Sequence, residues 1–584
     1  MPNAQSKTSL NPNVFTFKIG GEAGFGIMSA GLNFAKVATR SGYHTFDYTE
    51  YPSLVRGGHN VMQISVSKDR VDSQYATTDF LVALNQETLN LHEHELIEGS
   101  GVLYDSDHNI DVSHLPSYVK TFELPLTHII KEVNGSMVMR NSIAIGAALA
   151  LLDGDLNILK TLIEESFGHK KNDVVSINHK ACQIGYDYVL KEHAGDVKKI
   201  LTPISGFTFN PDAPSLLLPT GNEAIALGAV ASGMSFASIY PMTPTSNILH
   251  SLAPHQEKYG FVYKQPEDEI SAINMAIGAA HAGARSMVAT SGGGFALMSE
   301  GYGLAGITET PVVIIEGMRG SPATGLPTWT EQGDLRFVLH AHQGDFPRIV
   351  LAPGDVEEAF HASMLAFNLA EKYQTPVVVL VDKFICESHS SVAPFDYSNF
   401  KIDRGKLTLE KQDGYKRFAP SPDGISLRTV AGSGNHFVAN SDEHDKIGYS
   451  NEEIENRNTQ MNKRMQKLVT CSAQDMQAPV VYGPKDADVT IVSWGSNKGP
   501  ILEALKVLPN VNYVHITWIN PFPVEKLKQL LDNAKYLINI EANFSGQMHG
   551  LIKQHTSINI LNNFVKYDGR PFYPEEIVER VKGI

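Results

Sequence analysis

The sequence predicts a multidomain α/β protein with largely parallel sheets. Apolar runs of strand length recur along the chain, and segments of helix length separate them, which is typical of βαβ units. The length of 584 residues exceeds what one hydrophobic core supports and indicates three or four domains. A hydrophobic fraction of 42% and a charged fraction of 19% are those of an ordinary globular protein.

Composition and charge exclude several classes of protein. No apolar run reaches the roughly 18 residues of a membrane span, and the N-terminus MPNAQSKTSLNPN lacks the apolar core of a secretory signal, which predicts a cytoplasmic protein. The net charge of −15 argues against nucleic acid as the main partner. The three cysteines, Cys182, Cys386 and Cys471, form no C-x-x-C pair, so we expect free structural thiols and no iron–sulfur cluster on this chain.

The first domain is predicted to span residues 1–198, with a linker at 199–215 that is rich in Pro, Gly and Ser. The run VFTFKIG at 14–20 predicts a buried strand, and a helix is expected from Ile27 to about Arg40. A further strand is expected at HTFDYTEY. Later strands that complete a Rossmann-like unit are predicted near 61–67, 79–84 and 101–105.

Two glycine-containing loops interrupt this domain. G-E-A-G-F-G at 21–26 includes Gly24 and Gly26, and glycines there would let backbone N–H groups approach a phosphate at the helix N-terminus. The spacing differs from the usual dinucleotide fingerprint, so the loop alone is a weak signal. In the second loop Arg56 precedes Gly57, where it would clamp an anion or pin a turn.

The second domain is predicted for residues 216–400, and its stretch 236–295 carries the most informative pattern. A β-rich run ends in Tyr240-Pro241-Met242-Thr243-Pro244, and FVYKQP predicts a second strand. The prolines on both sides of Thr243 restrict its backbone and fix the direction of its hydroxyl. That hydroxyl either meets a ligand or caps the next helix, a role that Thr245 or Ser246 would fill equally well.

An unusually smooth helix, rich in Ala, Ile, Met and Gly, is predicted from Ile270 to Ala282. A third strand, Arg285 to Ala289, is expected to open into the turn Thr290-Ser291-Gly292-Gly293-Gly294. Glu269 stands at the start of the smooth helix, where the helix dipole favours an anion. It is either an ordinary first-turn acid or a functional carboxylate, because the strand ends of open α/β sheets bind ligands.

The rest of the chain continues the alternation after one irregular segment. Strands are expected at PVVIIEGM, FPRIVLAP and TPVVVLVDK, with a helix from Asp355 to Lys372. Residues 401–475 form a polar insertion that ends in a charged helix, and His436, Glu443 and His444 within it match no trusted metal motif. Residues 476–584 predict a third α/β domain.

These motifs together resemble one enzyme family, the 2-oxoacid:ferredoxin oxidoreductases, which use thiamine diphosphate. The resemblance rests on Y-P-x-T-P, the acid before the smooth helix, T-S-G-G-G, and the pairing of G-x-x-G-x-G with Y-P-x-x-x-R-G-G. It extends to the loop 317–335 and to Asn520-Pro521-Phe522-Pro523. It implies a Rossmann-like gamma domain, a pyrimidine-binding domain and a transketolase C-terminal-like domain, fused as a gamma–alpha subunit of the 2-oxoglutarate type.

The resemblance also implies roles for residues. Glu269 would hydrogen-bond the aminopyrimidine ring and assist loss of the thiazolium C2 proton, and Thr243 would face the 2-oxoacid beside the cofactor. Further substrate-binding candidates are Tyr240, Arg319 and Trp329. The remaining cofactor-binding candidates are Pro241, Pro244, Ser291 and Gly292 for thiamine diphosphate, and Gly24, Gly26, Arg56 and Gly57 for coenzyme A. Trp329 stands where family members often carry Arg or Lys, and Arg319 either supplies charge nearby or ties the loop.

The implied reaction is the oxidative decarboxylation of a 2-oxoacid with coenzyme A to acyl-CoA and CO2, with ferredoxin as the electron acceptor. The chain lacks a G-D-G diphosphate–Mg²⁺ motif and the thiolates for a cluster. The resemblance therefore implies a beta subunit that carries Mg²⁺ and a 4Fe–4S cluster, in an alpha2beta2 assembly. Pyruvate and branched-chain or aryl 2-oxoacids are alternatives to 2-oxoglutarate.

Two rival functions come from other classes. An NAD-dependent dehydrogenase would use the first glycine loop but would leave the central motif unexplained. A non-catalytic scaffold subunit would suit a chain that lacks half of an active site, but the presence of both Glu269 and Thr243 argues against it.

Overall fold

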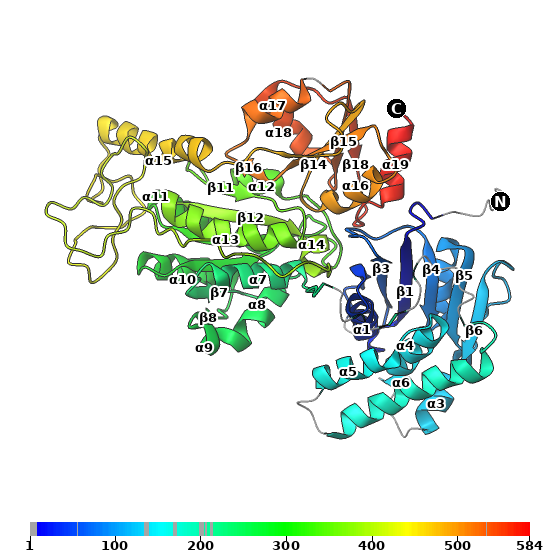
Figure 1. Cartoon of the computed structure of the whole chain (residues 1–584). Helices are drawn as coiled ribbons and strands as arrows, with labels where there is room; N and C mark the ends of the chain where they lie inside the picture. The colour runs from blue at the N-terminus through cyan, green and yellow to red at the C-terminus, as the bar shows by residue number, and fades with distance from the viewer. Residues whose placement is uncertain are drawn as a thin grey trace.

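The computed structural model describes residues 9–54, 57–132, 139–167, 172–197, 204, 207–208, 210, 214–532 and 534–584. Three sheets with flanking helices organise them (Figure 1). The strand orders are β2-β3-β1-β4-β5-β6, β16-β11-β12-β10-β9-β7-β8 and β13-β15-β14-β17-β18. The predicted multidomain α/β fold is thereby confirmed. No helix in this described part has the length and apolar content that a membrane crossing needs.

The first sheet belongs to the N-terminal domain, drawn blue to cyan in Figure 1. Its strands are β1 (Val14–Glu22), β2 (His44–Glu50), β3 (His59–Ser67), β4 (Thr78–Ala83), β5 (Leu96–Asp105) and β6 (Lys120–Leu124). Its helices are α1 (Ile27–Arg40), α2 (Gln86–His92), α3 (Leu126–Glu132), α4 (Arg140–Leu151), α5 (Leu156–Phe167) and α6 (Asn172–Glu192). β1 pairs in parallel with β4, whereas β3 runs antiparallel to both β1 and β2. The unit is therefore a mixed sheet and not an all-parallel Rossmann sheet.

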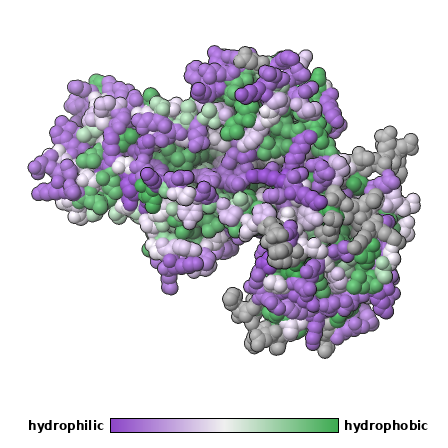
Figure 2. Space-filling model, viewed as in Figure 1, coloured by the Kyte–Doolittle hydropathy of each residue, from purple (hydrophilic) through white to green (hydrophobic). Residues whose placement is uncertain are grey.

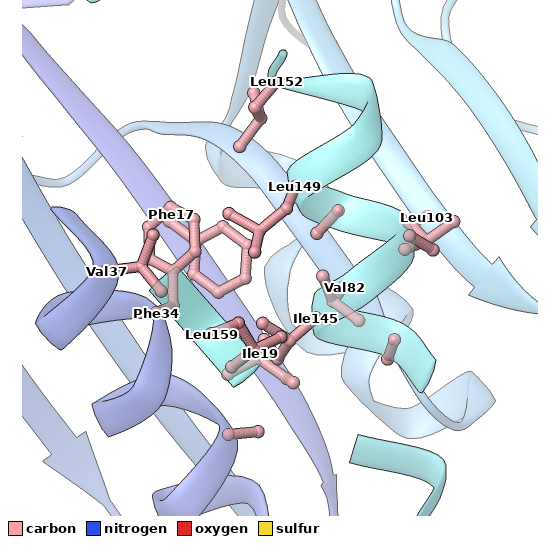
Figure 3. Close-up of a cluster of buried hydrophobic side chains, with 14 of the residues drawn as sticks. Phe17, Ile19, Phe34, Val37, Val82, Leu103, Ile145, Leu149, Leu152 and Leu159 are labelled. Atoms are coloured by element: carbon pink, nitrogen blue, oxygen red, sulfur yellow. The ribbon is translucent and has the colours of Figure 1, made fainter. Parts of the chain in front are cut away.

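Apolar side chains from both layers of this domain form its core (Figure 3). Phe17 of β1 stacks on Phe34 of α1, with ring centroids 3.8 Å apart. Ile145 and Leu149 of α4 complete the same cluster. The continuous burial of β1 from Val14 to Gly21 and the apolar stripe of α1 thus fix the position of the loop between them.

The second sheet is the centre of the molecule, drawn green in Figure 1. Its own strands are β7 (Phe236–Ser238), β8 (Val262–Lys264), β9 (Ser286–Thr290), β10 (Val312–Met318), β11 (Ile349–Leu351) and β12 (Pro376–Asp382). Its helices are α7 (Gly221–Ala231), α8 (Ser246–Leu252), α9 (Gln256–Tyr259), α10 (Glu269–His281), α11 (Gly292–Ile307), α12 (Leu335–His340), α13 (Val356–Tyr373) and α14 (Lys383–Glu387). These strands pair in parallel, as expected for buried βαβ units.

Residues 401–453 form a polar excursion with only isolated bridges, followed by α15 (Ile454–Gln474). Hydrophilic residues predominate over the visible surface of this insertion, at the left of Figure 2. The insertion is nevertheless tied to the central domain. Lys467 of α15 contacts Glu309 at 2.6 Å, and both side chains are fully buried.

The last domain contains β13 (Val480–Tyr482), β14 (Val489–Trp494), β15 (Val511–Ile516), β17 (Tyr536–Glu541) and β18 (Asn562–Val565). Its helices are α16 (Lys498–Leu505), α17 (Val524–Leu531), α18 (Gln547–Thr556) and α19 (Pro574–Lys582). The short strand β16 (Trp518–Asn520) leaves this domain and pairs antiparallel with β11 at the edge of the central sheet. The two sheets are therefore physically joined.

The N-terminal domain is held against the central domain by the segment that follows α14. The Thr45 backbone N–H donates to Ser391 Oγ at 2.8 Å, and Phe46 forms a bridge with Ser390. The buried Lys383 Nζ donates to the Thr49 carbonyl at 2.6 Å. These contacts fix the strand that leads into the second glycine-containing loop.

Candidate functional site

A buried carboxylate lies at the N-terminus of α10. The helix begins there because the Asp268 side chain accepts a hydrogen bond from the Ser271 backbone N–H at 2.7 Å and caps the first turn. Glu269 therefore does not serve as the cap. Its side chain is only 3% exposed, and Oε1 has no hydrogen-bond partner in the part of the chain that the structure describes. A buried charge without a partner is costly, so this group is poised for a ligand.

The N-terminus of α11 faces the same carboxylate. A β-carbon on Gly294 would lie 2.0 Å from Thr290 Oγ1 and 2.7 Å from Glu269 Oε1, so only glycine lets α11 approach so closely. Ser291 precedes the helix, is fully buried, and does not use its hydroxyl as a cap. The Ser291 hydroxyl also lacks a partner within the described residues. Glu269 Oε1 and Ser291 Oγ are thus two buried polar atoms without a partner among the described residues, on either side of the approach between α10 and α11.

Two more carboxyl groups lie at this end of the sheet. Glu316 of β10 is in register with Thr290 of β9 and is fully buried. Burial, and then the nearby Asp334, raise the pKa of Glu316 well above its usual range, while burial raises the pKa of Asp334 to about 6. Two neighbouring carboxyls do not both ionise at low cost, so burial and Asp334 together favour the neutral form of Glu316.

The loop Tyr240–Pro244 follows β7 at the same sheet edge. Arg319 Nη1 donates to the Thr243 carbonyl at 2.9 Å, so Arg319 ties this loop to the end of β10. Thr243 is half-buried. The N-cap residue of α8 is Thr245, and no side chain caps that helix. The Thr243 hydroxyl therefore does not act as the cap of this helix.

The loop between β10 and α12 carries Trp329 and meets the C-terminal domain. The Thr330 backbone N–H donates to the Gly569 carbonyl at 3.1 Å. The guanidinium carbon of Arg570 lies 3.5 Å from the centre of the Trp329 ring, which is a close cation–π contact. Trp329 and Arg570 line one wall of a pocket of about 420 Å³, and residues of the N-terminal sheet line the other.

The two glycine-containing loops of the N-terminal domain lie side by side. The Ala23 backbone N–H donates to the Gly58 carbonyl at 3.2 Å. Gly24 and Gly26 have φ values of 95° and 71°, and Gly57 has 76°, a conformation that favours glycine. Arg56, which the sequence pairs with these glycines, lies outside the described residues. The loop conformation leaves backbone N–H groups at the start of α1 for an anion.

A chain of hydrogen bonds in the N-terminal domain extends to the pocket that Trp329 and Arg570 line. His59 Nε2 lies 2.9 Å from His92 Nε2, and His92 Nδ1 lies 2.8 Å from Glu95 Oε1. Burial, together with the neighbouring His92 and Lys18, lowers the pKa of His59 to about 4, so His59 is neutral near pH 7. Lys18 forms an ion pair with Glu95.

The cysteines and His444 are the other side chains whose chemistry could suit a metal ion. Cys182, Cys386 and Cys471 are free and buried, and burial raises the pKa of Cys182 to about 11 and of Cys471 to about 12. His444 is buried, and its Nδ1 donates to the Asp442 carbonyl of the same loop at 2.9 Å. The described residues contain no group of three or more His, Cys, Asp or Glu side chains that would hold a metal ion.

The sequence did not identify Asp334, Glu316, Arg570 or His59 as site residues. Glu316 had a detectable signal, because it is the one acid in the apolar run PVVIIEGM. Arg570 had none, because its position depends on how the C-terminal domain packs against the loop that holds Trp329.

Three family models match consecutive parts of the chain. Residues 16–188 match pyruvate ferredoxin/flavodoxin oxidoreductase, and residues 227–463 match the thiamine diphosphate-binding domain of pyruvate flavodoxin/ferredoxin oxidoreductase. Residues 487–577 match core domain II of pyruvate:ferredoxin oxidoreductase. The match at 227–463 includes the whole region around Glu269.

Individual relatives agree with these matches. A 2-oxoacid:ferredoxin oxidoreductase subunit alpha from Saccharolobus solfataricus is 32% identical over 97% of both chains. The 2-oxoglutarate synthase subunit KorA from Methanocaldococcus jannaschii is 33% identical over 62% of this chain and 98% of its own length. A solved 2-oxoglutarate:ferredoxin oxidoreductase from Magnetococcus marinus, with 2-oxoglutarate, coenzyme A and succinyl-CoA bound, is 31% identical with a TM-score of 0.89, covering 98% of this chain and all of that one.

Proposed function

This chain belongs to the 2-oxoacid:ferredoxin oxidoreductase family, and we propose that it is the fused gamma–alpha subunit of an enzyme acting on 2-oxoglutarate. The reaction converts 2-oxoglutarate and coenzyme A to succinyl-CoA and CO2, and two electrons pass to ferredoxin. Support for the substrate comes from the 2-oxoglutarate enzymes among the relatives. We place the gamma domain at 1–198, the linker at 199–215, the pyrimidine-binding domain at 216–400, the insertion at 401–475 and the transketolase C-terminal-like domain at 476–584.

One observation carries the proposal: the carboxylate of Glu269 is buried and unpartnered beside the turn Ser291–Gly294. A carboxylate in that state fits a hydrogen bond to a ring nitrogen of the aminopyrimidine of thiamine diphosphate. The bound cofactor supplies a carbon nucleophile and an electron sink for decarboxylation. Glu269 would hydrogen-bond the ring nitrogen, and Ser291, Gly292, Pro241 and Pro244 are the other residues that would hold the cofactor.

The substrate is assigned to the loop Tyr240–Pro244. Thr243 presents its hydroxyl to the 2-oxoacid, and Arg319 fixes that loop through the Thr243 carbonyl. Because Arg319 is used in this contact, its first role is to position Thr243. Trp329 adds an apolar ring to the substrate side, which is the observation that favours pyruvate or an aryl 2-oxoacid as the alternative substrate.

A beta subunit is proposed to complete the site. Helices α10 and α11 expose Ile270 (49%), Met275 (45%) and Leu297 (51%) next to Glu269 and the Gly-rich turn. Apolar side chains so exposed around a half-built site fit a partner surface. We assign to that partner the diphosphate–Mg²⁺ site and the 4Fe–4S cluster, in an alpha2beta2 assembly. A scaffold role is the second candidate, and it predicts no catalytic effect of Glu269.

Coenzyme A is assigned to the N-terminal domain, at Gly24, Gly26, Arg56 and Gly57. The left-handed glycines beside the start of α1 support this placement, because they free backbone N–H groups for phosphate.

The test is to co-express this chain with its beta subunit and assay a panel of 2-oxoacids, with and without coenzyme A, with ferredoxin as acceptor. We expect 2-oxoglutarate to give the highest kcat/KM, and the chain alone to be inactive. Turnover by the isolated chain, or no turnover of any 2-oxoacid by the assembled complex, would overturn the proposal.

A further inference from the structure

The pocket between the N-terminal sheet and the Trp329 loop contains a cation that protein groups leave unpaired. Arg570 Nη1 donates to the Asp568 carbonyl at 3.0 Å, which engages one of the five guanidinium N–H groups. Within the described residues no Asp or Glu oxygen lies within 4.0 Å of the guanidinium, although the same criterion pairs other arginines such as Arg285 and Arg464. We propose that Arg570, held flat against Trp329, is an anion-binding group that receives a carboxylate or phosphate of the reactants.

The stacking geometry supports this role. The Trp329 ring covers one face of the guanidinium, whose central carbon lies 3.5 Å from the ring centre. Within the described residues, the bond to the Asp568 carbonyl is the one contact that engages the N–H groups. A planar edge with parallel N–H groups matches carboxylate and phosphate oxygens in a bidentate arrangement. Both residues line the pocket of about 420 Å³, which is large enough for part of a small ligand.

The other basic side chains in the lining are already paired or neutral. Lys18 is paired with Glu95, and His92 also bonds Glu95. The Lys18 ammonium and the Glu95 carboxylate are therefore both engaged by protein groups. His59 is neutral near pH 7, because burial lowers its pKa. Among the described residues of the lining, Arg570 is therefore the cation that would attract an anion.

The field of Arg570 reaches across the pocket. Burial and the nearby Glu50 raise the pKa of Tyr48 well above its usual range, and Arg570 opposes that shift. Glu50 also lines the pocket, so an anion is expected on the Trp329 side, away from Glu50. The two sides of the pocket therefore differ in charge.

Two anionic groups of the reactants have the negative charge that Arg570 would bind. The choice of these two groups rests on the proposed function. One is the distal carboxylate of 2-oxoglutarate, because Trp329 belongs to the loop that begins at Arg319 beside Thr243. The other is a phosphate of coenzyme A, because Tyr48, Pro52 and His59 of the N-terminal domain form the facing wall. The shared chemistry is an oxyanion bound by a stacked guanidinium.

The test compares Arg570→Gln with Arg580→Gln in the co-expressed complex. Arg580 also lies over an aromatic ring in the same domain, Phe564 at 5.3 Å, but it does not line this pocket. Calorimetric titration with 2-oxoglutarate and separately with coenzyme A gives binding constants, and steady-state assays give KM with 2-oxoglutarate, pyruvate and coenzyme A. Loss of a charged hydrogen bond predicts a binding constant weakened about tenfold or more in Arg570→Gln.

The outcomes separate the two sources. Weaker binding of 2-oxoglutarate with an unchanged KM for pyruvate assigns the carboxylate, and weaker binding of coenzyme A assigns the phosphate. Wild-type binding of both ligands by Arg570→Gln overturns the inference, as does wild-type complex that binds neither ligand. Binding that depends on Arg570 in a complex without turnover refutes the proposed reaction but retains the anion site. Arg570→Lys keeps the charge and is expected to be intermediate, and a melting temperature equal to that of Arg580→Gln excludes misfolding.

Discussion

A buried glutamate lies near each end of helix α11, and the two glutamates differ in whether protein groups pair with them. At the N-terminal end, Glu269 is 3% exposed and its Oε1 has no partner within the described residues. At the C-terminal end, Glu309 is fully buried and surrounded by cations. Lys463 and Lys467 of α15 each contact one of its carboxylate oxygens. One carboxylate is left open, and the other is fully compensated.

Glu309 occupies its position at a conformational cost. Its φ of 52° lies in the left-handed region, where glycine is the usual residue just after a helix. The sequence keeps a glutamate there because its side chain anchors the insertion, and Arg417 adds a hydrogen bond to its carbonyl at 2.8 Å. Burial opposes ionisation, but Lys463 and Lys467 hold the pKa of Glu309 well below its usual range.

The difference is the one expected between a charge with a structural role and a charge with a functional role. A folded protein compensates a buried charge when the charge only holds elements together. The polar atoms at the N-terminal end, Glu269 Oε1 and Ser291 Oγ, have no such compensation, which is the state expected before a polar ligand binds. Substitutions at the two ends should therefore affect activity at one end and stability at the other.

The largest effect is expected for Glu269→Gln. The variant keeps the shape of the side chain and removes its proton-transfer capacity, so the rate of the assembled complex should fall by about 10²–10⁴. Stability should not fall, because no protein partner of Oε1 is lost. Exchange of the thiamine C2 proton in the complex measures the affected step directly. Glu267→Gln, an exposed neighbour, is the control; a Glu269→Gln complex with unaltered exchange would identify Glu269 as an ordinary first-turn acid.

Glu309→Gln should have the opposite profile. It leaves Lys463 and Lys467 buried without their counter-charge, and breaking a buried pair from one side costs about 3–5 kcal/mol of unfolding free energy. Denaturant unfolding of the chain measures this loss. Glu300→Gln on the same helix is the control, because Glu300 is 84% exposed. If Glu309→Gln were as stable as that control, the comparison between the two helix ends would fail.

Asp334→Asn tests the pair of acids Asp334 and Glu316, through the pH dependence of the protein's stability. The pKa of Asp334 is raised from 3.8 to about 6 by burial, so between these values the unfolded chain loses a proton that the folded chain keeps. Stability should therefore decline as the pH rises from about 4 to about 6, by at most roughly 1.4 kcal/mol per pH unit for this group. Asp334→Asn should reduce that slope. An identical slope in both proteins would show that burial does not raise the pKa of Asp334.

The sequence predicted the order and type of the elements around the site well. The start of α10 was expected at Ile270 and is found at Glu269, and the strand before the Gly-rich turn was expected at 285–289 and is found at 286–290. Local capping and apolar periodicity encode such features. Contacts between distant segments were not predictable, because they depend on packing: β16 joins a different sheet from its neighbours, and Arg570 meets Trp329 across a domain boundary. The residue roles at Glu269 and Thr243 remain predictions.

The smallest expected effect belongs to Thr243→Val, which extends the comparison to the loop beside the open end of α11. The variant keeps the shape and deletes the hydroxyl, while the Arg319 hydrogen bond to the backbone carbonyl of residue 243 is retained. A lost substrate hydrogen bond should weaken use of the 2-oxoacid by about 0.5–3 kcal/mol, depending on whether the partner is charged. KM and kcat for the 2-oxoacid, with the melting temperature as a reference, are the measurements. Thr245→Val is the matched control, because Thr245 Oγ1 donates to the Met242 carbonyl at 3.0 Å and so has a structural role in the same loop. A Thr243→Val protein that melts early yet keeps normal 2-oxoacid kinetics would place Thr243 with Glu309, among the residues that only hold the fold together.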